Sequence, residues 1–267
     1  MLGVSLLRSN ASVKNILRFL GVGLAASVLG ACAFGPIPPT LEDNSFEIEC
    51  HPIANIELPQ FVVGYGSLMQ DESRKRTSPH AGPAHPVEVN GFRRGWFAKG
   101  DPLGFSTTYL GVAADPQSRV NAVIYRVEPT ELAATDQREA AYCRHSVPLP
   151  RIRSLEKEPF ELAESEAWIY VNRRGAIAVP SAQYPIVQSY VDIFVGGCLE
   201  QEQRFELAGF ARECVATTRD WSVHWVNDRL YPRRPFIYQP KARQIDTLLA
   251  QQLPEYFSRI RIETPSQ

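Results

Sequence analysis

The stretch Phe61-Val62-Val63-Gly64-Tyr65-Gly66-Ser67-Leu68-Met69 decides the fold and the site that the sequence predicts. Its first three residues are aromatic or β-branched, which favours the interior of a strand. Two glycines then bracket Tyr65, and glycine allows either a positive φ or a close approach of the backbone to a ligand. We therefore expect a buried strand that runs into a glycine turn, where the amides of Ser67 and Leu68 form a small nest for an anion or oxyanion.

Two other interpretations of this turn exist. The plainer one is a tight turn at a strand end that binds nothing, and the stretch by itself is typical of that too. The nucleophile elbow of serine hydrolases is disfavoured, because Gly-x-Ser-x-Gly centred on Ser67 requires glycine where the chain has Tyr65 and Met69.

The size and charge of the chain limit the class of protein. The chain has 267 residues and a net charge of −1, which fits one large domain or two small ones. Apolar residues make up 44% of it, enough for a full core. Because the charges nearly balance, we expect no nucleic-acid partner. The sequence indicates no oligomeric state.

The N-terminus has the pattern of a secretory signal. Arg8, Lys14 and Arg18 are followed by an uncharged stretch at 19–31, which is too short to span a bilayer. It ends in Leu29-Gly30-Ala31-Cys32, which resembles the lipobox of bacterial lipoproteins. We therefore predict a signal peptide at 1–31 and a lipid on Cys32. An uncleaved amphipathic N-terminus and a misassigned start codon are the alternatives.

Residues 32–59 are expected to form the lipidated cysteine and a Pro-rich tether, ahead of a domain at 60–260. The run Gly35-Pro36-Ile37-Pro38-Pro39 is stiff and extended, and the polar stretch after it lacks periodicity. Ala33 follows the cysteine, and the absence of Asp there favours the outer membrane in such lipoproteins. We therefore expect a cell-envelope protein that is anchored to the outer membrane and faces the periplasm.

Four cysteines remain after Cys32, an even number that permits disulfides in an exported protein. They allow three connectivities, and free buried thiols are an equal alternative. We expect no metal site, because neither Cys-x-x-Cys nor His-x-x-x-His occurs in the chain. The four are Cys50, Cys143, Cys198 and Cys214.

The rest of the chain alternates between expected strands and helices. A hairpin is predicted across the turn Asp115-Pro116, and Gly196-Gly197 is expected to end a helix. Arg74 and Arg76 are interpreted as solvated. The expected strands are 60–65, 87–96 with a break at Asn90-Gly91, 105–113, 120–127, 144–149 and 166–171. The expected helices are 130–143, 180–198, 204–214 and 245–253.

The helix expected at 130–143 is the one that bears on chemistry. If Leu132 faces the core, Glu139 lies on the same face in a partly dry place. The pKa of that carboxyl group would then rise, as a general base or acid near neutral pH requires. The opposite orientation is equally compatible with the periodicity, since Ala133, Ala134, Ala140 and Ala141 form a competing apolar face.

Three motifs together resemble the γ-glutamylcyclotransferase-like superfamily. Gly64-Tyr65-Gly66-Ser67-Leu68 is similar to its Tyr-Gly-Ser signature, and Asp136-Gln137-Arg138-Glu139 is similar to its Asp-x-x-Glu element. Pro180-Ser181-x-x-Tyr184 resembles its Pro-Ser-x-x-Tyr segment. The order and spacing of the motifs carry the resemblance over about residues 60–200.

The resemblance implies an α+β fold, a small mixed β-barrel of about five to six strands flanked by helices. It implies release of 5-oxoproline from a small-molecule γ-glutamyl amide, with Glu139 as general base and acid and no cofactor. Tyr65, Gly66, Ser67 and Leu68 would bind the substrate, whose carboxylate would contact Tyr65, Ser67 or an arginine such as Arg93. The leaving group is not indicated.

Two alternatives from other classes are also compatible with the sequence. One is a lipid-anchored, non-catalytic module that binds γ-glutamyl groups or peptides. The other is a structural envelope lipoprotein, which the anchor and tether alone would support. The carboxylate of Glu139 favours an enzyme, since a pure binder gains little from a negative charge beside an anionic ligand.

Overall fold

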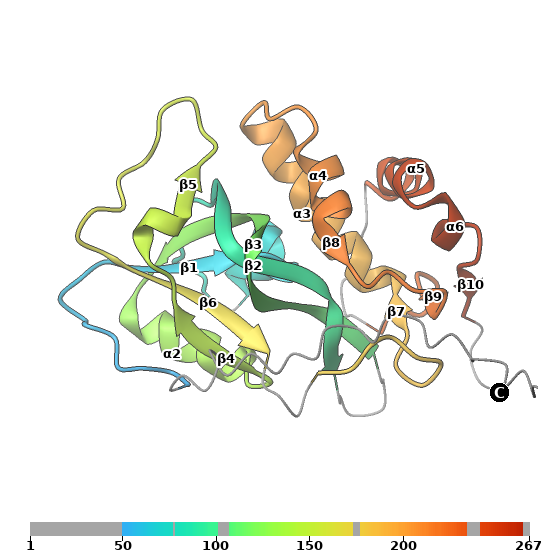
Figure 1. Cartoon of the computed structure of the whole chain (residues 1–267), viewed down its shortest axis with the longest axis horizontal. Helices are drawn as coiled ribbons and strands as arrows, with labels where there is room; N and C mark the ends of the chain where they lie inside the picture. Colours follow the sequence, from blue (N-terminus) through green and yellow to red (C-terminus); the bar gives the residue numbers. More distant parts are fainter. Residues whose placement is uncertain (1–49, 77, 101–106, 173–176, 234–240, 264–267) are drawn as a thin grey trace, which may run out of the picture. The chain divides into compact units, whose positions relative to one another are not determined.

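Two long antiparallel strands, β2 (His85–Gly100) and β3 (Thr107–Val127), form the middle of the sheet (Figure 1). The computed structural model describes residues 50–76, 78–100, 107–172, 177–233 and 241–263. The signal expected at 1–31 and most of the tether lie outside these residues. No helix in the described ranges is long and apolar enough to cross a membrane.

The main sheet has the strand order β4-β6-β1-β3-β2-β5, and β8 also pairs with β2. The expected strand at 60–65 is β1 (Gln60–Gly64), which lies antiparallel to β3 and parallel to β6. The mixed α+β class is therefore confirmed. Closure into a barrel is not, because the described parts of the end strands β4 and β5 do not pair. The remaining strands of this sheet are β4 (Tyr142–Ser146), β5 (Ile152–Ser154), β6 (Glu166–Asn172) and β8 (Thr218–Arg219).

The hairpin expected across Asp115-Pro116 is wrong, although the break at Asn90-Gly91 is confirmed. Both flanking segments belong to β3 and pair with β2, where Asn90 lies opposite Arg119 and Phe92 opposite Ala114. Gly91 has a φ of 89° at this irregularity, a value that favours glycine. The Asp115 carboxylate accepts hydrogen bonds from the Gln117 amide and the Ser118 hydroxyl, so the turn residues form a bulge within one strand.

The helices begin and end differently from the prediction. Two short helices, η2 (Ser67–Met69) and α1 (Asp71–Lys75), follow β1. The expected helix 130–143 is α2 (Pro129–Arg138), and 180–198 is α3 (Gln188–Arg204). The others are α4 (Phe210–Thr217), α5 (Ala242–Gln252) and α6 (Pro254–Phe257), with η3 (Leu149–Arg151) before β5. A second sheet pairs β9 (Trp225–Asn227) with β7 (Ile186–Val187) and β10 (Arg261–Ile262).

Gly197 does not end α3, because it serves a close contact instead. A Cβ at this position would lie 2.6 Å from the Gln70 amide nitrogen and 2.7 Å from the Met69 carbonyl carbon. The helix therefore packs directly on the backbone that follows η2. Upstream, Ser181 and Tyr184 form a hydrogen-bonded turn and not a helix start.

Arg74 is wholly buried, which contradicts the expectation of a solvated side chain. Its guanidinium pairs with Asp71, donates to the Leu68 carbonyl oxygen at 3.2 Å and lies over the Tyr125 ring. The prediction failed because an arginine that is satisfied by neighbouring acceptors can enter the core.

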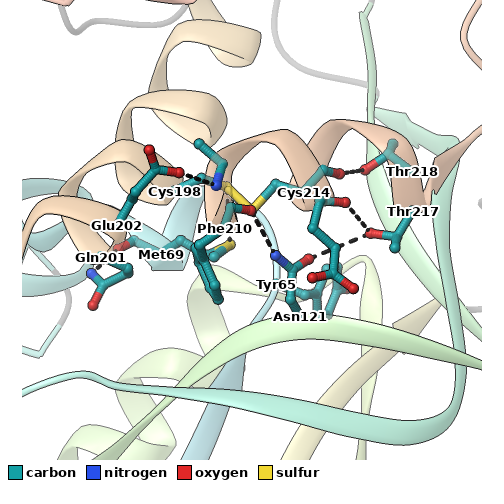
Figure 2. Close-up of a disulfide and its surroundings, with 12 residues drawn as sticks. Tyr65, Met69, Asn121, Cys198, Gln201, Glu202, Phe210, Cys214, Thr217 and Thr218 are labelled. Carbon is teal, nitrogen blue, oxygen red and sulfur yellow. Dashed lines mark hydrogen bonds between the residues drawn. A yellow bond between two sulfur atoms is a disulfide. The ribbon is translucent and has the colours of Figure 1, made fainter. Parts of the chain in front are cut away.

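The cysteines pair as Cys50–Cys143 and Cys198–Cys214. The first disulfide attaches residues 50–59, which were expected to belong to the tether, to β4 beside the His51 amide bond to the Arg144 carbonyl. The second joins α3 to α4, which lie side by side (Figures 1 and 2).

Candidate active site

One pocket is lined both by Glu139, the predicted catalytic residue, and by Tyr65–Leu68, the predicted substrate-binding loop. Its empty space, including the part open to solvent, is about 300 Å³. The rest of its wall is mainly aromatic and aliphatic, from β1, β3, β4, β6 and α3. These further lining residues are Val63, Leu110, Tyr142, Tyr170 and Tyr190.

The glycines of the loop are needed for close contacts, and neither has a positive φ. A Cβ on Gly64 would lie 2.8 Å from the Leu68 Cβ, so this glycine lets η2 fold back on the end of β1. A Cβ on Gly66 would lie 2.9 Å from the Tyr190 hydroxyl oxygen. The loop is thus fitted between its own strand and α3.

The loop that lines the pocket has backbone donors that no described protein group accepts. The first hydrogen bond of η2 runs from the Met69 amide to the Gly66 carbonyl at 3.0 Å. Within the described residues, the amides of Gly66, Ser67 and Leu68 donate to no protein acceptor. Amide groups that lack a partner and border one cavity are suited to bind an anionic oxygen.

Glu139 is the C-cap of α2, one residue after the last helical position. The orientation that places Leu132 in the core is confirmed, since Leu132 is buried and Ala133 is exposed. The Glu139 side chain is 16% exposed, and its Oε1 lies 3.1 Å from the Arg138 Nε. The carboxylate is therefore largely buried and lies beside a guanidinium.

Arg138 connects the two halves of the candidate site. Besides its contact with Glu139, it donates to the Ser67 hydroxyl at 3.2 Å and to the Ser73 carbonyl at 2.7 Å. The carboxylate from α2 and the loop after β1 are therefore held by one side chain. Arg138 lies within the Asp-x-x-Glu motif, but nothing in the sequence pattern distinguishes it as a residue of the site.

The tyrosine hydroxyls of the pocket wall are engaged with the protein. Tyr65 donates to the Tyr170 carbonyl oxygen at 2.5 Å, and Tyr142 donates to the Leu110 carbonyl oxygen at 2.9 Å. Burial, reinforced by the charge of Glu139, raises the pKa of Tyr65 and of Tyr142 well above the ordinary value. Both are therefore neutral donors at physiological pH.

Asp136, the first residue of the Asp-x-x-Glu motif, is not among the residues that line the pocket. It accepts a 2.6 Å hydrogen bond from the Tyr170 hydroxyl and pairs with Arg144 and His51 at 3.2 and 3.1 Å. Burial, with the hydrogen bond to Asp136, raises the pKa of Tyr170. Asp136 therefore orients a residue of the pocket wall.

Arg93, an expected partner for the substrate carboxylate, lies elsewhere. Its guanidinium is 3.6 Å from the Asp220 carboxylate and over the Phe97 ring, and it is not among the residues that line the pocket. Successive residues of a strand face opposite sides, so the next residue, Arg94, points inward. Two consecutive arginines in a predicted strand indicate that one of them faces inward. The sequence does not show which of the two is buried.

Residues 62–188 match the model of the family described as gamma-glutamyl cyclotransferase, AIG2-like. This match supports the family that the motifs indicated. No curated protein matches the chain.

Three solved structures resemble the chain at low identity. A gamma-glutamyl cyclotransferase is 14% identical and covers 72% of this chain and 99% of its own, with a TM-score of 0.46. An uncharacterized protein from Homo sapiens is 14% identical and covers 61% of this chain and 90% of its own, with a TM-score of 0.44. A glutathione-specific gamma-glutamyl cyclotransferase from yeast is 12% identical and covers 60% of this chain and 97% of its own, with a TM-score of 0.36. All three TM-scores are below 0.5, so these structures carry no further argument, and the support for the family comes from the sequence match over residues 62–188.

Proposed function

We propose that the domain is a γ-glutamyl cyclotransferase that releases 5-oxoproline from a small γ-glutamyl amide. One observation carries this proposal: Glu139 and the loop Tyr65–Leu68, far apart in the sequence, line the same pocket. The same pocket is thus lined by a carboxylate that can move a proton and by a loop whose amides can bind an oxyanion. The family match supports the same chemistry.

The reaction is an internal displacement. The α-amine of the substrate forms a bond to its own γ-carbonyl carbon, a five-membered ring closes, and the γ-amide C–N bond breaks. Folding the substrate so that nitrogen meets carbon removes the entropy cost of a two-body encounter, which is worth up to about 7–11 kcal/mol. The tyrosine-lined wall would hold the glutamyl chain in that folded form.

Glu139 is the proton carrier in this scheme. It takes a proton from the α-ammonium group, which makes the nitrogen nucleophilic, and returns it to the departing amine nitrogen. The ring nitrogen loses its second proton to the released amine or to solvent. Arg138, whose Nε lies 3.1 Å from the Glu139 Oε1, orients the carboxylate before the substrate binds.

The amides of Gly66, Ser67 and Leu68 would bind the oxygen on which negative charge develops. Preorganised donors of this kind contribute roughly 3–4 kcal/mol each when well aimed. Ser67 also has a hydroxyl that accepts from Arg138, so its side chain serves the loop and its amide serves the substrate.

The domain would act in the cell envelope, anchored through a lipid on Cys32. The order of charged leader, apolar stretch and lipobox supports this localisation. Two disulfides support it as well, since disulfides form and persist in oxidising compartments. Loss of membrane association and of lipid labelling in a Cys32→Ser protein would test it.

The activity is tested by 5-oxoproline release from a panel of γ-glutamyl amides by the full-length protein. Glu139→Gln is the test variant, and Glu72→Gln, an exposed carboxylate on α1, is the matched control. Release by the wild type and the control but not by Glu139→Gln is expected. If the folded wild type binds γ-glutamyl compounds without releasing 5-oxoproline, the protein is a binding module instead.

A further inference from the structure

Arg94 is a wholly buried arginine directly behind the pocket loop. It extends from β2, and its Nη1 donates to the Tyr65 carbonyl oxygen at 3.0 Å and to the Asn121 carbonyl oxygen at 2.9 Å. Its Nη2 donates to the Asn121 Oδ1 at 3.0 Å, to the Cys214 carbonyl oxygen at 2.8 Å and to the Thr217 hydroxyl at 3.0 Å. Its Nε donates to the Thr218 hydroxyl at 2.8 Å, so these donors fasten it to α4, to the residue after α4 and to β3.

All of these acceptors are neutral, and Arg94 has no carboxylate within ion-pair distance in the part of the chain that the structure describes. Its guanidinium lies 4.7 Å from the centre of the Phe194 ring. Burial lowers the pKa of Arg94 to about 9, against the opposing influence of Tyr190, Tyr65 and Glu213. The side chain is therefore a positive charge at neutral pH, and the nearest groups do not cancel it.

The peptide between Tyr65 and Gly66 connects this charge to the pocket. A trans peptide is planar, and its C=O and N–H point in opposite directions. The carbonyl end faces Arg94, whereas Gly66 lines the pocket. The Gly66 amide has no acceptor among the described protein atoms. A hydrogen bond donated to the carbonyl polarises the peptide and strengthens its N–H as a donor.

We propose that Arg94 is a positioning residue that polarises the Tyr65–Gly66 peptide, so that the Gly66 amide becomes a strong donor to an anionic oxygen in the pocket. The identity of that oxygen rests on the proposed function: it is the developing oxyanion or the substrate carboxylate. The charge acts through the backbone, and the guanidinium itself does not touch the substrate.

A purely structural role for Arg94 would be to fasten α4 to the sheet. Figure 2 shows the acceptors on that side, where the Thr218 hydroxyl also donates to the Cys214 carbonyl and Thr217 lies beside Asn121. Thr218→Val removes the 2.8 Å contact with the Arg94 Nε and leaves the Tyr65 contact in place. It is therefore the matched control that separates the two roles.

The experiment observes the peptide directly. Tyr-Gly occurs once in the sequence, at 65–66, so full-length protein that contains carbonyl-¹³C tyrosine and ¹⁵N glycine gives one NMR signal from this peptide. We expect Arg94→Met, and Arg94→Gln as a second neutral variant, to move the Tyr65 carbonyl carbon and the Gly66 amide upfield. Thr218→Val should leave both in place, and Arg94→Lys should retain part of the wild-type shift.

The kcat and KM of the neutral Arg94 variants show which oxygen the Gly66 amide binds. If it is the developing oxyanion, the neutral variants lower kcat by about 10- to 100-fold, less than removal of a whole oxyanion donor; if it is the substrate carboxylate, they raise KM by a comparable factor. An unmoved signal in both neutral variants overturns the proposal, and so does an equal movement in Thr218→Val. Because the NMR signal needs no turnover, an inactive wild type would refute the proposed function and still leave the polarisation decided.

Discussion

The Arg138 Nε lies 3.1 Å from the Glu139 Oε1, where α2 ends at the mouth of the pocket. This ion pair keeps a negative charge at the position from which a substrate ammonium would lose its proton. Both side chains are largely buried, 18% and 16% exposed, so the attraction between the charges is offset by the cost of removing them from water. The pair therefore matters for chemistry more than for folding.

Glu139→Gln should abolish turnover without unfolding the protein. The amide keeps the size of the side chain but cannot accept a proton, so kcat should fall by about 10²- to 10⁴-fold. Ligand binding should persist, as measured by calorimetry with an unreactive γ-glutamyl analogue. Turnover equal to that of Glu72→Gln would remove Glu139 from the mechanism.

Ser67→Ala should weaken substrate affinity more than it slows the reaction. The hydroxyl fixes the loop through the 3.2 Å hydrogen bond from Arg138, whereas the Ser67 amide remains in the variant. KM should rise about tenfold or more and kcat should change by less than about threefold, since a hydrogen bond to a charged group contributes about 1.5–3 kcal/mol. A large fall in kcat at constant KM would contradict this assignment.

Gly66→Ala should lower the free energy of unfolding by about 1–3 kcal/mol, as overpacking does. The new Cβ would lie 2.9 Å from the Tyr190 hydroxyl oxygen, and its next neighbour is at 3.7 Å. Tyr190→Phe removes that oxygen, so the double variant should recover part of the loss in a urea titration.

Gly197→Ala is the control for this pair. Its Cβ would meet the backbone of Met69 and Gln70, which no single side-chain change relieves, so Tyr190→Phe should not rescue it. If Tyr190→Phe restores stability to Gly197→Ala, or fails to restore it to Gly66→Ala, then the contact with Tyr190 does not cause the loss of stability in Gly66→Ala.

Acid should destabilise the protein partly through Asp71. Burial would raise the pKa of this carboxyl group, but the hydrogen bond from Lys75 and the charges of Arg74 and Arg204 lower it below the ordinary value. A lowered folded-state pKa contributes stability that is present above the unfolded pKa, about 3.9, and is lost as the pH falls through the folded pKa. The stability difference between wild type and Asp71→Asn should therefore shrink below about pH 4. A difference that stays constant from pH 6 to pH 2.5 would rule this out.

The sequence predicted the parts of the site that depend on local pattern. The β-branched run before Gly64 is a short-range signal, and the strand follows from it. The periodicity of the helix left two orientations open, and the burial of Leu132 in the core decides between them. The elements 87–96 and 166–171 were also predicted because strand residues dominate there. The resemblance that the motifs carry predicted that the Tyr65 loop and Glu139 belong to one site, and both line the same pocket.

What the sequence could not predict depends on contacts between distant segments. Gly197 has the appearance of a helix end, yet the helix continues because Met69 and Gln70 pack against it. Arg94 and Arg93 are equivalent in sequence, and only the acceptors on α4 and at Tyr65 decide which is buried. Asp115-Pro116 is a true turn signal, but the partner strand converts it into a bulge.

The two disulfides should contribute unequally to stability, because they close loops of different length. Cys198 and Cys214 are 16 residues apart, whereas Cys50 and Cys143 are 93 apart. In the chain-entropy model, loops of these sizes correspond to about 3 and about 4–5 kcal/mol. Urea titrations of the two double Cys→Ala variants should reproduce that order. The reverse order would mean that the unfolded chain is already compact around Cys50 and Cys143, or that packing of α3 on α4 outweighs loop entropy.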